Sequence, residues 1–275
     1  MEEEELPGLA HTDIVRYQQG DKYPAGDVVA REEPLEVRLN GRPLVYLMRI
    51  PGDDAMLAAG FCLSEGLISS REDIEVLQHC LEGGPAAENA AVPGNLVEIR
   101  AKLASGSERF EIARVIRTGC GGADLEREVD LAGIKVDSDV SFPAGVIARA
   151  PDLLLEGQEV FKATGGTHGA GVFGADGRLV VVKEDVGRHN AVDKVLGYLL
   201  LSGEPAEDKG IILSGRLSYE MVLKGARAGV PLLCSVSAPT ALGVEVGRKT
   251  GVTLVGFLRG GSFNVYSHPD RIGGD

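Results

Sequence analysis

The chain has 275 residues, of which 44% are hydrophobic, and carries a formal net charge of -13. A chain of this length can bury a large core and divides into one or two domains. The negative charge argues against a nucleic-acid partner, because binding to phosphates requires clustered Lys and Arg, and an aromatic content of 5% without Trp argues against a base-stacking platform.

Residues 1–27 are expected to form a flexible acidic N-terminus, since the chain begins MEEEE. This start lacks the basic and apolar regions of a signal peptide, and no later apolar run approaches the ~20 residues of a membrane helix. The four cysteines are far apart and form no CxxC pair, which indicates a reducing compartment. We therefore expect a cytoplasmic protein that contacts no membrane.

Residues 28–142 predict a small α+β domain. Ordered structure is expected from Glu36 onward, where alternating residues flank Asn40-Gly41, a strong hairpin signal. A helix is expected over residues 53–66, capped by an aspartate and closed by a glycine. Cys62 within it is expected to be a buried structural thiol. The other elements predicted here are a loop over 80–95 and strands over 95–100 and 110–116.

The last of these strands leads into Arg117-Thr-Gly-Cys-Gly-Gly-Ala123, a turn that contains Cys120. The glycines leave the sulfur open to close approach, and Arg114 and Arg117 favour the thiolate, which is the nucleophilic form. An inert, small apolar residue in a turn is an equally good interpretation of Cys120 from these residues alone.

Residues 143–275 predict a second domain, with the boundary near Ser141-Phe142-Pro143. A helical segment over 146–155, broken at Pro151, precedes a hairpin that turns at Asp176-Gly177 between 161–174 and 178–185. Short apolar strands then alternate with helices, which predicts an α/β domain with a largely buried mixed sheet. The remaining elements are helices at 188–201, 218–228 and 240–248 and strands at 210–213, 232–236, 252–258 and 263–266.

Two nucleotide-binding motifs are matched only superficially. The glycines at 169, 171 and 174 satisfy G-x-G-x-x-G, but the Asp176-Gly177 hairpin turn follows where a dinucleotide fingerprint would begin a helix. The segment 243–250 has three residues between its glycines where a P-loop has four, and it lies late in a predicted helix. Both matches are rejected.

Polar residues follow three predicted strands and precede three predicted helices. Unpaired N–H groups at helix starts favour anions, and arginines add bidentate contacts to phosphate. Each segment alone is better explained as an ordinary helix cap, whereas three together favour a ligand that bears phosphate. The residues expected at this site are Arg188, His189, Ser214, Arg216, Ser237 and Thr240.

Two histidines each allow two interpretations of their role. His168, among glycines and threonines, is either a proton shuttle beside Cys120 or a turn residue bonded to backbone. His189, at a predicted helix start, is either a donor to a ligand or part of a cap. Cys234, in an apolar strand, is expected in the core.

Eight blocks, in order over residues 28–271, resemble the formate dehydrogenase accessory protein (FdhD) family. They are Glu33–Leu44, Arg49–Asp54, Gly60–Gly66, Thr164–His168, Glu184–Lys194, Ser214–Ser218, Ser237–Thr240 and Gly256–Asn264. The resemblance implies a sulfur carrier that accepts persulfide sulfur from a cysteine desulfurase. It then passes the sulfur to the molybdenum or tungsten bis-molybdopterin guanine dinucleotide cofactor, before that cofactor enters the formate dehydrogenase catalytic subunit.

The resemblance further implies a cytidine-deaminase-like architecture for residues 143–275, a homodimer, and guanine nucleotides as surrogate ligands. Cys120 would be the sulfur-bearing residue, and the dinucleotide pocket would include residues already named at the strand ends. The residues added to that pocket by the resemblance are Thr164, Gly165, Gly166, His168, Phe257, Leu258, Arg259, Gly260, Gly261 and Ser262.

The chain departs from the family turn C-G-x-C, because Ala123 replaces the second cysteine. A relay between two sulfurs is therefore excluded. The chain also lacks the H-x-E and P-C-x-x-C pattern of a zinc deaminase, so no metal site is predicted. Two alternatives remain: a chaperone that binds the cofactor without transferring sulfur, and a Cys-His hydrolase that uses Cys120 with His168 or His189.

Overall fold

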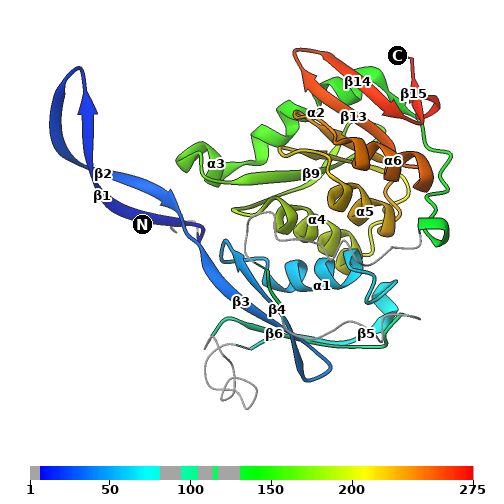
Figure 1. The fold of residues 1–275 in the computed structure, drawn as a ribbon, viewed down its shortest axis with the longest axis horizontal. Helices are drawn as coiled ribbons and strands as arrows, with labels where there is room; N and C mark the ends of the chain where they lie inside the picture. The colour runs from blue at the N-terminus through cyan, green and yellow to red at the C-terminus, as the bar shows by residue number, and fades with distance from the viewer. Residues whose placement is uncertain (1–6, 81–93, 105–113, 117–130, 275) are drawn as a thin grey trace.

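The computed structural model describes residues 7–80, 94–104, 114–116 and 131–274, and shows a mixed α/β protein (Figure 1). Its first large sheet has five strands in the order β5-β6-β3-β4-β7. The strands are β3 (Glu33–Leu39), β4 (Arg42–Arg49), β5 (Ile74–Cys80), β6 (Leu96–Ala101) and β7 (Arg114–Ile116). The predicted hairpin at Asn40-Gly41 is confirmed, with φ of 53° and 78° at its two turn residues.

The second large sheet has six strands in the order β10-β9-β11-β12-β13-β14. The central strands β11, β12 and β13 run parallel, while β9 and β14 pair with them in antiparallel fashion, so the predicted mixed sheet is confirmed. The strands are β9 (His168–Gly174), β10 (Leu179–Asp185), β11 (Lys209–Leu213), β12 (Leu232–Ser235), β13 (Thr253–Arg259) and β14 (Ser262–Ser267). A short parallel pair joins β8 (Phe142–Pro143) to β15 (Ile272–Gly273).

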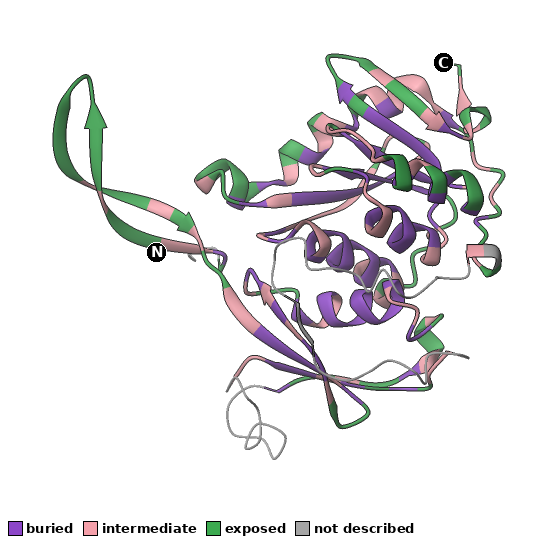
Figure 2. Cartoon of the chain, viewed as in Figure 1, coloured by how far each residue is buried: buried purple, intermediate pink, exposed green. Residues whose placement is uncertain are grey.

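Alternating side chains of this sheet pack against helices on its two faces. Ala170 and Val172 of β9 join the core formed with three helices, whereas Phe173 joins the core formed with the helix on the opposite face. The first face is covered by α4 (Arg188–Ser202), α5 (Tyr219–Arg227) and α6 (Ala241–Thr250), and the second by α2 (Ala144–Gly157). This pattern buries both faces of the central strands (Figure 2).

The helix predicted over residues 53–66 is confirmed as α1 (Asp54–Ser64), which lies between the five-stranded sheet and α4. The two helices cross at glycines: a Cβ added to Gly60 would lie 1.8 Å from the carbonyl oxygen of Asp193, and one added to Gly197 would lie 1.9 Å from that of Met56. Both glycines are therefore required for this close approach. The predicted domain boundary at residue 142 stays a prediction.

Secondary structure begins earlier than the sequence predicts. β1 (Leu9–Gln18) and β2 (Asp21–Ala30) form a largely exposed antiparallel hairpin, here called the arm, which projects from the body (Figures 1 and 2). Its turn has φ of 52° at Gln19 and 96° at Gly20, the conformation of a tight hairpin turn. The expectation of ordered structure only from Glu36 was therefore wrong. The sequence does not signal this hairpin, because Gln-Gly is not a typical turn pair and the two strands lack an alternating apolar face.

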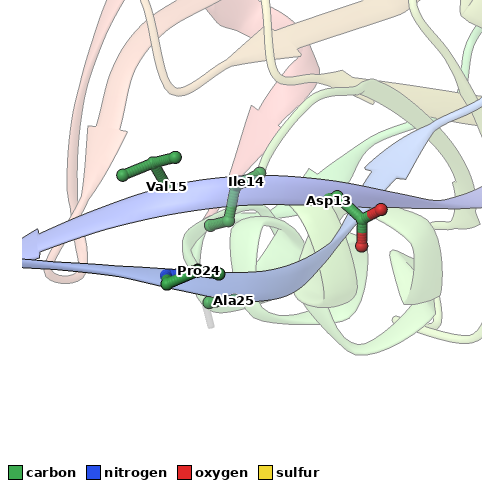
Figure 3. A pocket seen from close by; sticks show the side chains of 5 residues that line it. All are labelled: Asp13, Ile14, Val15, Pro24 and Ala25. Atoms are coloured by element: carbon green, nitrogen blue, oxygen red, sulfur yellow. The ribbon is translucent and has the colours of Figure 1, made fainter.

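An open hollow lies along the arm between its strands (Figure 3). The residues that line it are Asp13, Ile14, Val15, Pro24 and Ala25. None of these is a predicted site residue, so the hollow is separate from the candidate site described below.

Two elements near residue 160 differ from the prediction. Helix α2 continues through Pro151 instead of breaking there, since burial of Ile147 and Leu154 on the sheet outweighs the loss of one helical hydrogen bond. A short helix, α3 (Glu159–Thr164), occupies positions expected to begin a strand. Its first N–H groups, those of Val160 and Phe161, each donate to the Glu184 carboxylate at 2.8 Å. This cap comes from more than 20 residues away and leaves no local sequence signal.

The structure bears out the rejection of both nucleotide motifs. The glycines of G-x-G-x-x-G lie within strand β9 and do not begin a helix, and the false P-loop lies within α6. Among the described residues, no helix is both long enough and apolar enough to cross a membrane.

Candidate functional site

The candidate site lies at one edge of the six-stranded sheet. Strands β10, β11, β12 and β13 all end at this edge, and the antiparallel β9 begins there. Helices α4, α5 and α6 start within a few residues of those strand ends (Figure 1). The three predicted helix starts therefore lie on one side of the molecule, and the positive end of a helix dipole favours anions.

His168 is joined to the loop that follows β11. Its Nδ1 lies 3.1 Å from the Ser214 hydroxyl, which also accepts the Gly169 N–H at 3.0 Å. In the tautomer protonated at Nε2, the His168 Nδ1 accepts the Ser214 hydroxyl proton. Burial lowers the pKa of His168, and the charges of Arg188 and His189 lower it further. The side chain is thus a neutral imidazole in a positive environment.

The start of α4 packs against the same loop. A Cβ on Gly215 would lie 3.3 Å from Cδ of Arg188, so glycine permits the arginine stem to lie close to the loop. His189 Nε2 lies 2.5 Å from a carboxylate oxygen of Glu220, in the first turn of α5. Glu220 thereby links the starts of α4 and α5. The only sequence signal for this role of Glu220 is its position at the start of a predicted helix.

The loop after β12 is held by hydrogen bonds to the loops on both sides of it. The Ser235 hydroxyl donates to the Gly215 carbonyl at 2.6 Å and accepts the Ser237 N–H at 2.9 Å. The Ser237 carbonyl in turn accepts the Phe257 N–H at 2.9 Å. Ser235 therefore joins the loop after β11 to the loop after β12. The sequence did not indicate this role, because Ser235 ends an apolar strand.

Thr240 and Thr164 both serve the backbone. The Thr240 hydroxyl accepts the Gly243 N–H at 3.1 Å and caps α6. The Thr164 hydroxyl donates to the Val160 carbonyl and accepts the Gly166 N–H, while Gly165, with φ of 66°, ends α3. The Thr240 contact agrees with the cap alternative left open for the helix starts, whereas the Thr164 contacts fix the turn at the end of α3.

The segment 257–262 reaches the site through its first residue. Phe257 is bonded to Ser237, whereas the Leu258 side chain is fully buried in the core and faces no ligand. Arg259, Gly260, Gly261 and Ser262 form the turn between β13 and β14, with φ of 57° and 77° at the two glycines. Arg216, by contrast, is exposed in the loop before α5.

The chemistry of the edge suits an anion and not a cation. It brings together three helix starts, Arg188 and two histidines, and Glu220 is paired with one of these, His189. The nearby Asp185 is already neutralised by Lys194 at 2.8 Å and accepts backbone N–H groups of Ile50 and Gly187. No group of three potential metal ligands occurs within the described ranges.

Cys120 lies outside the described residues. Cys62 and Cys234 are both buried, as predicted. Burial raises the pKa of the Cys62 thiol to about 12, with a further contribution from Asp193, and burial also raises that of Cys234. Neither thiol is suited to act as a nucleophile.

Fold and site together define an α/β protein in which three helix starts meet at one edge of a mixed sheet. The chain belongs to the FdhD/NarQ family, whose model matches residues 30–273. It is 40% identical over 267 residues to "Sulfur carrier protein FdhD" of Streptomyces coelicolor, covering 94% of each chain. It is 39% identical over 264 residues to the protein of the same name from Saccharolobus solfataricus, covering 94% of this chain and 96% of that one.

The fold has also been solved. A crystal structure of a proposed formate dehydrogenase accessory protein from Desulfotalea psychrophila matches with a TM-score of 0.75 and 28% identity. The match covers 97% of this chain and all of that one.

Proposed function

We propose that this protein is a sulfur carrier for formate dehydrogenase, which passes sulfur to a bis-molybdopterin guanine dinucleotide cofactor containing molybdenum or tungsten. The names of its relatives support the carrier role. The observation that most supports cofactor binding is the meeting of three helix starts with Arg188 and His189 at one sheet edge. Such an edge suits the phosphates of a dinucleotide, and guanine nucleotides would serve as surrogate ligands.

Cys120 is the residue proposed to carry the sulfur. Its thiolate attacks the terminal sulfur of a cysteine desulfurase persulfide, a new S–S bond forms, and the desulfurase cysteine leaves as a thiolate. When the terminal sulfur passes on, Cys120 leaves as a thiolate, and an acceptor metal that takes the sulfur as sulfide is oxidised by two electrons. Ala123 provides no second thiol, so the persulfide is not lost to a neighbouring disulfide.

The partners proposed are a cysteine desulfurase, the formate dehydrogenase catalytic subunit and a second copy of this chain, in the cytoplasm. The finer architecture proposed is an N-terminal α+β domain over 28–142, followed by a cytidine-deaminase-like domain over 143–275. The layered arrangement of the two large sheets is compatible with that division.

The test is to incubate the protein with a desulfurase and cysteine, and then to locate added sulfur by peptide mass spectrometry. We expect sulfur on Cys120 and none on Cys62 or Cys234, the buried internal controls. The Cys120→Ala variant should lose both the label and its support of formate dehydrogenase activity. Unlabelled Cys120, or full support by the variant, would exclude the carrier role and favour a binding chaperone.

A further inference from the structure

The arm exposes large apolar side chains although it is anchored to the body. Val15 and Tyr17 of β1 are 52% and 72% exposed, and Tyr23 of β2 is 39% exposed (Figure 2). At the base of the arm, the Arg31 N–H donates to the Gly8 carbonyl at 2.8 Å. A two-stranded hairpin without further packing is only marginally stable in water. The arm therefore presents a surface that contact with another chain would stabilise.

The turn of the arm determines which backbone groups face outward. The two-residue turn Gln19-Gly20 makes Gln18 and Asp21 a hydrogen-bonded pair, and such pairs alternate along the strands with pairs that are not hydrogen-bonded. Val15 and Pro24, which lie opposite each other (Figure 3), form a pair of the second kind. Their backbone groups consequently point away from the neighbouring strand, toward the two outer edges of the arm.

The two outer edges differ in whether a further strand can pair with them. Pro24 has no N–H to offer at the edge of β2, and proline is a common means of blocking an edge strand. The edge of β1 presents the N–H and C=O groups of Asp13, Val15 and Tyr17 and contains no proline. Within the described residues, β1 pairs with β2 alone. The β1 edge is therefore the one to which a strand can be added.

This edge is complementary to itself when a second β1 pairs with it antiparallel about a two-fold axis. An axis at Asp13 or Arg16 would place like charges opposite each other. An axis at Val15 instead pairs this valine with its own counterpart, and Asp13 with Tyr17 of the other copy. Lys22 Nζ lies 5.8 Å from the centroid of the Tyr17 ring, so the incoming carboxylate would approach a cation. Apolar contact and charge both favour this register.

We propose that two copies of this chain associate through their arms, with their β1 strands paired antiparallel about a two-fold axis at Val15. The pairing joins two exposed hairpins into one larger sheet and covers the exposed valine of each copy with that of the other. The inference rests on the second copy in the proposed function and adds to it the element that joins the copies.

Sedimentation of the full chain measures this association. Val15→Lys and Val15→Glu each place two like charges opposite each other at the axis, whereas Val29→Lys changes a side chain of β2 that is 41% exposed and is the matched control. We expect each Val15 variant to raise the dimer dissociation constant at least about tenfold, and the control to stay within about threefold of the parent. An equimolar mixture of the two Val15 variants should recover dimers, since opposite charges then face each other.

A cross-link locates the contact. In the proposed register the two Val15 Cα atoms lie about 5.5 Å apart, as in any hydrogen-bonded antiparallel pair, and this separation suits a disulfide. Val15→Cys should therefore give a disulfide-linked dimer on oxidation, and Val29→Cys should not. Both variants carry Cys120→Ala, so that the native thiol cannot form the link.

The outcomes separate the arm contact from the proposed function. A dimer that Val15→Lys leaves intact would overturn the arm contact and place the second copy elsewhere. A parent that stays monomeric would overturn both the arm contact and the second copy. If Val15→Lys lowered the affinity of a monomeric parent for the desulfurase, the arm would belong to that partner and the proposal would fail. Sulfur labelling of Cys120, measured separately, reports on the carrier role in each case.

Discussion

At the scale of single residues, His168 should make anion binding depend on pH. Burial and the charges of Arg188 and His189 hold its pKa below the usual 6.5, so the folded protein keeps the ring neutral near pH 7. An anion bound beside the ring favours the protonated form and raises this pKa. By linkage, anion affinity should then increase as the pH falls through the pKa of the bound state, and level off below that of the free state.

Sulfate titrations between about pH 8 and about pH 5 test this expectation, because sulfate does not change charge in that range. His168→Gln keeps a hydrogen-bonding partner for Ser214 but cannot titrate, so its affinity profile should be flatter than that of the parent. Identical profiles for the two proteins would show that His168 lies apart from the bound anion.

At the scale of elements, the glycine crossing of α1 and α4 should tolerate no side chain. A methyl group at Gly60 would meet the Asp193 carbonyl, a backbone atom that cannot rotate away. Gly60→Ala should therefore lower the free energy of unfolding by about 1–3 kcal/mol or more, as measured by urea denaturation. Gly26→Ala in β2, where nothing lies within 4 Å, is the control and should be neutral. Equal stability of the two variants would mean that the helices separate freely.

Elements specified by neighbouring residues were predictable from the sequence, and elements specified by distant ones were not. The Asn40-Gly41 and Asp176-Gly177 turns and the helices from residue 188 onward are confirmed, because turn glycines and apolar spacing act locally. Helix α3 was missed because its cap is the side chain of Glu184, and the site-fixing role of Ser235 depends on a carbonyl 20 residues away.

At the scale of the whole molecule, a buried ion cluster joins the two large sheets. Lys224 of α5 donates to the Ser64 hydroxyl at 2.7 Å and to the carboxylates of Glu65 and Asp193, each at 3.0 Å. Ser64 and Glu65 lie at the end of α1, on the five-stranded side. The starts of α4 and α5 border the candidate site, so the same helices that form the site also hold the two halves together.

Burial alone would lower the pKa of Lys224, but the charges of Asp193 and Glu65 outweigh it and raise the pKa above 10.5. A raised lysine pKa stabilises the folded state below the unfolded value of 10.5, and this stabilisation is lost as the pH rises through the folded-state pKa. We therefore expect alkaline unfolding of the parent to begin above the ordinary titration range of lysine.

Replacement of Lys224 by Met should test whether this cluster makes the protein unfold as one unit. Lys224→Met leaves Asp193 buried without its cation, which should cost about 3–5 kcal/mol. The double variant Lys224→Met with Asp193→Asn removes both charges and should recover part of that loss. Because the cluster joins both sheets, calorimetry should show one transition that shifts to lower temperature. Two separate transitions in the parent would instead mean that the halves unfold independently, and that the cluster does not couple them.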